Sequence, residues 1–136
     1  MDLVSVDPIL NIYDREWPIR TYQEQQPPVK TVFSEGARTA SVLDSIVSPG
    51  CIISGAKLRH SILSPWVKLN SFSEVEDSII FENVQVGRYS KIKRAIIDKN
   101  VIVPPNTEIG YNLESDKKKF TVSESGIVII SKGYIW

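Results

Sequence analysis

The sequence predicts an all-β fold in which an extended N-terminal arm leads into a parallel β-helix of about four hexapeptide-repeat coils, closed by a C-terminal hairpin. Three observations support this prediction. Four similar segments recur along the chain, aliphatic residues recur at about every sixth position within them, and four of the eight prolines lie before residue 30. We expect residues 1–40 to form the arm or interdomain linker and residues 41–136 to form the β-helix domain with its hairpin.

The repeated segments are SIVSPGCII, SILSPWVKL, SIIFENVQV and AIIDKNVIV, which begin at Ser45, Ser61, Ser78 and Ala95. Their spacings of 16, 17 and 17 residues are typical of hexapeptide coils. The aliphatic residues expected to point inward are Val47, Ile53, Leu58, Leu63, Leu69, Val75, Ile80, Val86, Ile92, Ile97, Val103 and Ile109. The first coil supplies Val47 and Ile53 and then slips by one residue at Leu58, which follows Ile53 after five positions.

Small or β-branched residues follow these aliphatic residues four positions later. They are Val67, Ser73, Val84, Ser90, Val101 and Thr107. A triangular coil has room for one large inward side chain on each side and for a narrow one at the neighbouring corner. Stacked coils then align like side chains into one column, which no single coil could bury by itself.

A β-sandwich is the alternative all-β fold, because it also has short strands at regular spacing. Sandwich strands alternate apolar and polar residues without a sixfold recurrence, so the pattern favours the β-helix. The periodicity does not give the hand of the coil, and parallel crossovers are normally right-handed.

The N-terminal arm combines prolines with large apolar side chains. Pro8, Pro18, Pro27 and Pro28 oppose a long helix or a central strand. Its apolar residues include Tyr13, Trp17, Ile19, Tyr22 and Phe33. This is too much apolar surface for a free linker, so we expect the arm to pack against a partner such as a further domain.

The repeat lapses after Gly110. The segment YNLESDKKK, which includes Lys117, Lys118 and Lys119, reads as a polar loop. Two strands, Phe120 to Val122 and Ile127 to Ile130, are expected to form a hairpin that closes the open end of the column.

Charge and cysteine content exclude several classes of function. The 16 basic residues balance the 16 acidic ones, which argues against a general nucleic-acid or membrane-surface binder. Cys51 is the sole cysteine, so neither an internal disulfide nor a thiolate zinc cluster is expected. The chain shows no signal peptide and no apolar run of membrane-spanning length, and a cytoplasmic location fits best.

Three segments resemble the bacterial glucose-1-phosphate adenylyltransferase family: VDPILNIYDREWPIRTY at the start, DSIVSPGCIISGAKLRHSILSPWVKLNS in the middle, and RAIIDKNVIVPPNTEIG followed by FTVSESGIVII. Many acyltransferases and other sugar nucleotidyltransferases share hexapeptide repeats, but the Trp-Pro-Ile-Arg-Thr arm and the Ser-Pro-Gly-Cys coil are more specific. The resemblance is to the C-terminal domain of this family and implies a left-handed coil.

The family makes ADP-glucose from ATP and glucose 1-phosphate for glycogen or starch synthesis, with Mg and ATP bound by an N-terminal catalytic domain. This chain has no Gly-rich phosphate loop, so we expect it to carry no cofactor and no catalytic residues and to be inactive alone. The resemblance implies that it regulates and assembles a parent enzyme, as a partner of the catalytic domain within a homo-oligomer, normally a tetramer.

The resemblance also implies binding of phosphorylated metabolite effectors. Lys99 follows the Ile-Ile-Asp of the last coil and Lys132 follows the Gly-Ile-Val-Ile-Ile strand, and both match family positions that carry basic effector contacts. Lysine keeps the point charge of arginine but lacks its bidentate fork. Arg94 and Arg20 are further anion-binding candidates, although Arg94 belongs to a basic stretch with Arg88, Lys91 and Lys93 that solvation also explains.

His60 is the one residue that could support an enzymatic function of this chain, because hexapeptide acyltransferases use a histidine base. The resemblance places it at an exposed corner, which favours a solvent-exposed role. Cys51 occupies a repeat position equivalent to Val67, so we assign it to the core. A free-standing acyltransferase and a purely structural scaffold therefore stand as the alternatives to a regulatory domain.

Overall fold

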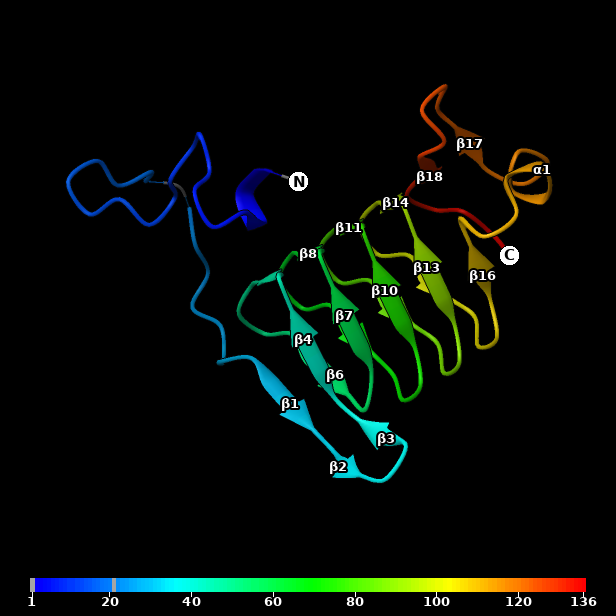
Figure 1. The fold of residues 1–136 in the computed structure, drawn as a ribbon, viewed down its shortest axis with the longest axis horizontal. Coiled ribbons are helices and arrows are strands. Elements are labelled where there is room, and N and C mark those ends of the chain that lie inside the picture. Colours follow the sequence, from blue (N-terminus) through cyan, green and yellow to red (C-terminus); the bar gives the residue numbers. More distant parts are fainter. Residues whose placement is uncertain (1, 21) are drawn as a thin grey trace.

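The computed structural model describes residues 2–20 and 22–136. Three sheets form the sides of a β-helix, with each coil contributing one short strand to each sheet (Figure 1). We name each sheet after its first strand in the chain. The β1 sheet contains β1 (Lys30–Val32), β6 (Ile52–Ser54), β9 (Lys68–Leu69), β12 (Gln85–Val86) and β15 (Ile102–Val103). The β4 sheet contains β4 (Ser41–Leu43), β7 (Lys57–Arg59), β10 (Glu74–Glu76), β13 (Lys91–Lys93) and β16 (Glu108–Ile109).

The third side is the longest. The β5 sheet contains β5 (Ile46–Val47), β8 (Ile62–Leu63), β11 (Ile79–Ile80), β14 (Ala95–Ile97), β18 (Val128–Ile130) and β17 (Thr121–Val122). Its strands pair in parallel except for β17, which pairs antiparallel with β18. The parallel β-helix predicted from the sequence is therefore confirmed.

In-register pairing explains the burial of the aliphatic column. Val75 pairs with Leu58 on one side and Ile92 on the other, so the one-residue slip at Leu58 keeps the inward side chains aligned. The predicted inward residues from Ile53 to Ile109 are all buried. Val47 in the first complete coil is only half-buried. Within residues 2–20 and 22–136, the column of aliphatic side chains forms one core.

Small polar residues link the layers where each repeat begins. The hydroxyl of Ser61 donates to the Arg59 carbonyl at 2.7 Å and accepts from the Ser78 backbone N–H at 3.1 Å. The Ser78 hydroxyl accepts from the Ala95 N–H at 3.1 Å in the same way. This ladder satisfies polar atoms that the coil buries at a tight corner.

The corners themselves use left-handed backbone. Residues other than glycine with φ near +60° recur at equivalent places in successive coils, as at Trp66, Asn83 and Asn100. Asn and Asp tolerate this conformation best, and the coil imposes it on aromatic residues as well. Side chains at equivalent corner positions of successive coils therefore line one edge of the molecule.

The C-terminal end of the arm joins the first coil of the β-helix. Residues 30–32 lie within the range expected for the arm and form β1, which pairs with β6. A small hairpin of β2 (Ser34–Glu35) and β3 (Arg38–Thr39) follows. The arm begins with a short 3-10 helix, η1 (Asp2–Val4), and Val4 and Val6 line a hollow shared with the coils. The segment that follows loops away from the coils (Figure 1). Tyr13 and Trp17 are exposed, so the described residues leave this apolar surface uncovered.

The predicted hairpin is confirmed, but the prediction of a polar loop before it is wrong. Residues 113–116 form α1 (Leu113–Asp116), whose first turn is capped by Asn112 accepting from the Ser115 N–H at 3.1 Å. Asp116 is buried and accepts from the Gly110 N–H at 2.9 Å. Polar composition favours a loop, yet these two local hydrogen bonds close a helical turn.

The hairpin closes the column on the side of the last coil. Residue Ile130 extends the inward row beyond Ile97, and both are buried. Phe120 and Tyr134 pack against the core, with their ring centroids 5.1 Å apart. In the described part of the chain no helix is long and apolar enough to cross a membrane.

Candidate anion-binding site

Lys99 and Lys132 lie side by side although 33 positions separate them. Ile97 of β14 pairs with Ile130 of β18, and each lysine lies two residues after the last residue of its strand. The lysines therefore occupy the same corner of two adjacent layers, and both are exposed. Neighbouring strands lie about 4.8 Å apart, so one phosphate group between the two side chains could contact both ammonium groups.

Asp98 holds the two lysine-bearing turns together. Its Oδ1 accepts from the Lys99 N–H at 2.7 Å, and its Oδ2 accepts from the Lys132 N–H at 3.3 Å. The Lys99 N–H is the main cause that lowers the pKa of the Asp98 carboxyl, and the Lys132 N–H and both lysine charges add to it, against partial desolvation. The carboxylate therefore binds backbone groups and fixes the spacing of the lysines.

Neither ammonium group is taken up by an ion pair within residues 2–20 and 22–136. Two lysines and one aspartate give this corner a net positive charge. The equivalent corner positions of earlier coils hold Glu82, Pro65 and Pro49, so positive charge is confined to the C-terminal end of this edge. Periodicity alone could have found this contrast, because the equivalent positions follow from the 17-residue repeat.

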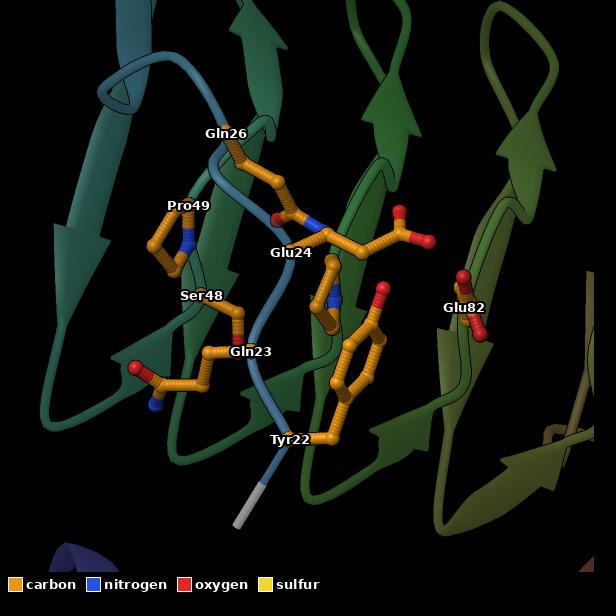
Figure 2. Close-up of a pocket in the computed structure, with 8 residues that line it drawn as sticks. Tyr22, Gln23, Glu24, Gln26, Ser48, Pro49 and Glu82 are labelled. Carbon is orange, nitrogen blue, oxygen red and sulfur yellow. The ribbon is translucent and has the colours of Figure 1, made fainter. Parts of the chain in front are cut away.

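Further along the same edge, the arm and the coils enclose a hollow of about 400 Å³ (Figure 2). Its lining consists of Tyr22, Gln23, Glu24, Gln26, Ser48, Pro49, Pro65 and Glu82. The arm is held here because the Gly50 N–H donates to the Pro27 carbonyl at 2.7 Å. Among the residues that the structure describes, the lining contains two carboxylates and no cation, so the hollow disfavours anions. No sequence pattern indicated this hollow, because its walls come from distant segments.

Arg94 is not brought together with the lysine pair. It lies at the opposite end of β14 from Lys99, where its Nη2 donates to the Ser125 carbonyl of the capping hairpin at 2.7 Å. Arg20 lies exposed in the arm, outside the coils. The anion-binding roles expected for both arginines remain predictions.

The rest of the basic stretch is arranged on the outer face of the β4 sheet. Lys91 of β13 lies between Glu74 and Glu108, its partners on the adjacent strands. Lys93 forms an ion pair with Glu76 at 3.3 Å. These lysines alternate with carboxylates across strands, as stacked parallel strands require to avoid like-charge contacts.

His60 lies at the corner between β7 and β8 and is partly exposed. Its Nδ1 lies 2.5 Å from Oδ1 of Asp77, which occupies the same corner one layer on. Val4 and Val6 of the arm line a shallow hollow beside this pair. The contact orients one imidazole nitrogen of a side chain that is 44% exposed, and a histidine base needs both features.

Cys51 is fully buried, as its place in the repeat predicts. Burial raises the pKa of its thiol, although backbone N–H groups of Val67 and Trp66 oppose the shift. The thiol is therefore part of the core and no nucleophile. The residues that the structure describes contain no group of three or more His, Cys, Asp or Glu side chains that could hold a metal ion.

Comparison with known proteins agrees with this architecture. Residues 27–130 match the family described as GlmU-like, C-terminal hexapeptide. The chain is 53% identical over 134 residues to the glucose-1-phosphate adenylyltransferase of Koribacter versatilis. This alignment covers 98% of the chain and 32% of that protein. It is 56% identical over 131 residues to the same-named protein of Methylococcus capsulatus, covering 96% of this chain and 31% of that protein.

A third relative, the glucose-1-phosphate adenylyltransferase of Anaeromyxobacter sp., is 58% identical over 135 residues, covering 97% of this chain and 33% of that protein. The chain thus spans about a third of the length of the curated relatives it matches. The resemblance inferred from the arm, the Ser-Pro-Gly-Cys coil and the hairpin is confirmed. With its stacked coils and a match over residues 27–130, the chain belongs to the GlmU-like C-terminal hexapeptide family.

Proposed function

We propose that the chain is the regulatory and assembly domain of a glucose-1-phosphate adenylyltransferase and that Lys99 and Lys132 bind phosphorylated effectors. The observation that carries this proposal is the alignment of two unpaired, exposed lysines on adjacent layers, with Asp98 linking their turns. The parent enzyme would make ADP-glucose from ATP and glucose 1-phosphate, with Mg bound by a separate catalytic domain. The isolated chain would not turn over substrate.

The effector site would work through the hairpin. Asp98 belongs to the turn after β14, and its Oδ2 contacts the turn after β18. An anion held by Lys99 and Lys132 adds a second link between the last coil and the capping hairpin. Binding would therefore stabilise one placement of the hairpin, and a catalytic domain that contacts it could respond. Assembly of four subunits in the cytoplasm would give such coupling several interfaces.

Isothermal titration calorimetry of the full chain tests the effector site. We expect fructose 1,6-bisphosphate to bind. Its affinity should fall at least tenfold in Lys99→Ala and in Lys132→Ala, because each variant removes one of the two lysine charges that contact the ligand. AMP and inorganic phosphate serve as competing anions, and the affinity should decrease with added salt.

Lys68→Ala is the matched control, because Lys68 is an exposed lysine on the β1 sheet, away from this corner. Its binding should equal that of the unmodified chain. Unchanged affinity in the Lys99→Ala/Lys132→Ala double variant would exclude the site. No binding of any of these anions would favour a structural scaffold.

The contact between His60 and Asp77 favours a second candidate function, a hexapeptide acyltransferase with His60 as general base. Acetyl transfer from acetyl-coenzyme A, followed with His60→Ala as the control, separates the two functions. Turnover lost in that variant would support the acyltransferase, and absence of turnover in the unmodified chain would remove it.

A further inference from the structure

The outer face of the β5 sheet carries a continuous row of isoleucines. Strand pairing places one in each layer, in the order Ile46, Ile62, Ile79, Ile96 and Ile129. All five side chains are partly exposed. Isoleucine suits a strand, but a stacked row of five leaves an apolar stripe open to water.

The other two outer faces are different. The corresponding row on the β4 sheet is Ser41, Lys57, Glu74, Lys91 and Glu108, with opposite charges on successive layers from Lys57 onward. The row on the β1 sheet is Lys30, Ile52, Lys68, Gln85 and Ile102, in which polar and apolar residues are mixed. The apolar stripe is therefore a property of one side of the coil, and the fold itself does not require it.

The stripe is also hollowed. A depression of about 410 Å³ lies over β11 and β14, and its lining consists of Asp77, Ile79, Arg94, Ala95, Ile96 and Ile127. A protruding aliphatic side chain from a partner fits such an apolar depression. The partner surface should then be apolar as well, with charges at its edge to meet Asp77 and Arg94.

A ladder of polar side chains, three of them acidic or basic groups other than histidine, borders the stripe at the corner before each of the first four strands. Its members are Asp44, His60, Asp77 and Arg94, each two residues before an isoleucine of the row. All four share a φ between +46° and +48°, so the corner presents them in the same way. Read in the reverse direction, the ladder sets Arg94 against Asp44 and Asp77 against His60. It is complementary to itself.

We propose that the isoleucine face pairs with the same face of a second copy of this chain, about a two-fold axis parallel to the strands. The layers of the two copies then run in opposite directions. Ile62 lies opposite Ile79 of the second copy, Ile46 lies opposite Ile96, and Asp44 meets Arg94 at both ends. This inference makes the assembly part of the proposed function specific and does not depend on the effector site.

The charges select this arrangement from its neighbours. A shift by one layer, centred on Ile79, places Asp77 against Asp77 of the second copy. A two-fold axis along the stack instead places the ladder opposite the other corner, where Asp77 meets Phe81 and only Arg94 finds an opposite charge, on Asp98. Like charges or unpaired charges at a closing interface reduce affinity, so the opposed arrangement is favoured.

A charge-swap experiment tests the proposal, because Asp44 and Arg94 are three layers apart in one chain, about 14 Å. Analytical ultracentrifugation of the full chain at micromolar to millimolar concentrations should detect a dimer. Asp44→Lys and Arg94→Glu should each weaken dimerisation about tenfold, and the double variant should return to within about threefold of the unmodified chain. Ile79→Lys should abolish the dimer.

Lys68→Glu on the β1 sheet is the matched charge-reversal control and should leave the dimer unchanged. Circular dichroism on each variant checks that the fold is retained, and Asp44→Lys is read first because Arg94 also contacts the hairpin. A monomer at all concentrations would overturn the proposal and assign the face to another protein. Survival of the dimer in Ile79→Lys would also overturn the proposed interface, and so would failure of the Asp44→Lys/Arg94→Glu double variant to restore dimerisation. Either result would leave the assembly role intact.

Discussion

At the scale of single residues, Gly110 shows how little space the layers leave. It lies after β16 with φ of +83°, and a Cβ at this position would lie 1.8 Å from the Lys93 carbonyl oxygen. That oxygen belongs to the backbone of the layer below and cannot move aside without breaking the stack. Gly110 is therefore required for close approach as well as for its backbone conformation.

Gly110→Ala should destabilise the chain by more than about 3 kcal/mol, because the clash adds to the cost of a left-handed alanine. The midpoint of urea unfolding measures the change. Gly133→Ala is the control, since Gly133 has a similar φ of +78° with open space around it. A loss of about 1–2 kcal/mol is expected there. Equal losses in both variants would contradict the role assigned to the Lys93 carbonyl.

The pKa of Asp98 gives a prediction for pH. Because the folded chain lowers this pKa, chiefly through the Lys99 N–H, the ionised carboxylate stabilises the fold above the pKa that an unfolded aspartate has. The stabilisation is lost as the pH falls through the lowered pKa. The unfolding free energy of the unmodified chain should therefore exceed that of Asp98→Asn at neutral pH, and the two should converge in acid. A difference independent of pH would contradict this.

At the scale of elements, the β4 sheet depends on charge alternation. Glu76 of β10 lies between Arg59 and Lys93, at 4.0 and 3.3 Å from their nitrogen atoms. Parallel in-register strands place equivalent residues directly against one another, so a row of equal charges would repel along its whole length. The outer face therefore carries sequence information that the inward column does not.

Glu76→Lys should cost about 1 kcal/mol of stability at low salt, since it stacks three cations on partly exposed positions where solvent screens each pair. Glu76→Gln should cost less, because it removes the attraction without adding repulsion. Chemical unfolding at low and at high sodium chloride measures both. The Glu76→Lys loss should shrink at high salt, and an undiminished loss would show that packing rather than charge is responsible.

The coils were predictable from the sequence because their pattern is local and repeated. Ser45, Ser61, Ser78 and Ala95 mark the register, and the slip at Leu58 is visible as a spacing of five. The terminal elements were less predictable. The strand β1 is defined by its pairing with β6, and α1 by the cap at Asn112, so neither follows from hydrophobic periodicity.

The candidate site was predicted in part. Lys99 and Lys132 were identified singly by resemblance, while their alignment follows from the pairing of β14 with β18, which skips the helix and the loop between them. Arg94 was grouped with them, but the length of β14 separates it from Lys99. The isoleucine face could have been found from the repeat, since its members precede the inward residues Val47, Leu63, Ile80, Ile97 and Ile130.

At the scale of the whole molecule, the stacked coils separate the proposed functions onto different sides. The lysine corner lies after the strands of the β5 sheet, the charge ladder lies before them, and the isoleucine row lies between. Stability in such a stack is roughly a sum over adjacent layers, so a change on one edge leaves the other edges intact. Effector binding and self-association should therefore be separable by mutation.

We propose that this domain makes nucleotidyl transfer respond to anions through Lys99 and Lys132. The direct test joins the chain to the remaining part of the Methylococcus capsulatus relative, in place of the matching third, and measures ADP-glucose synthesis with and without fructose 1,6-bisphosphate. Synthesis should respond to the anion in the chimaera and lose that response in Lys99→Ala/Lys132→Ala, with the basal rate retained. An active chimaera whose response is the same with and without the two lysines would contradict this role of Lys99 and Lys132.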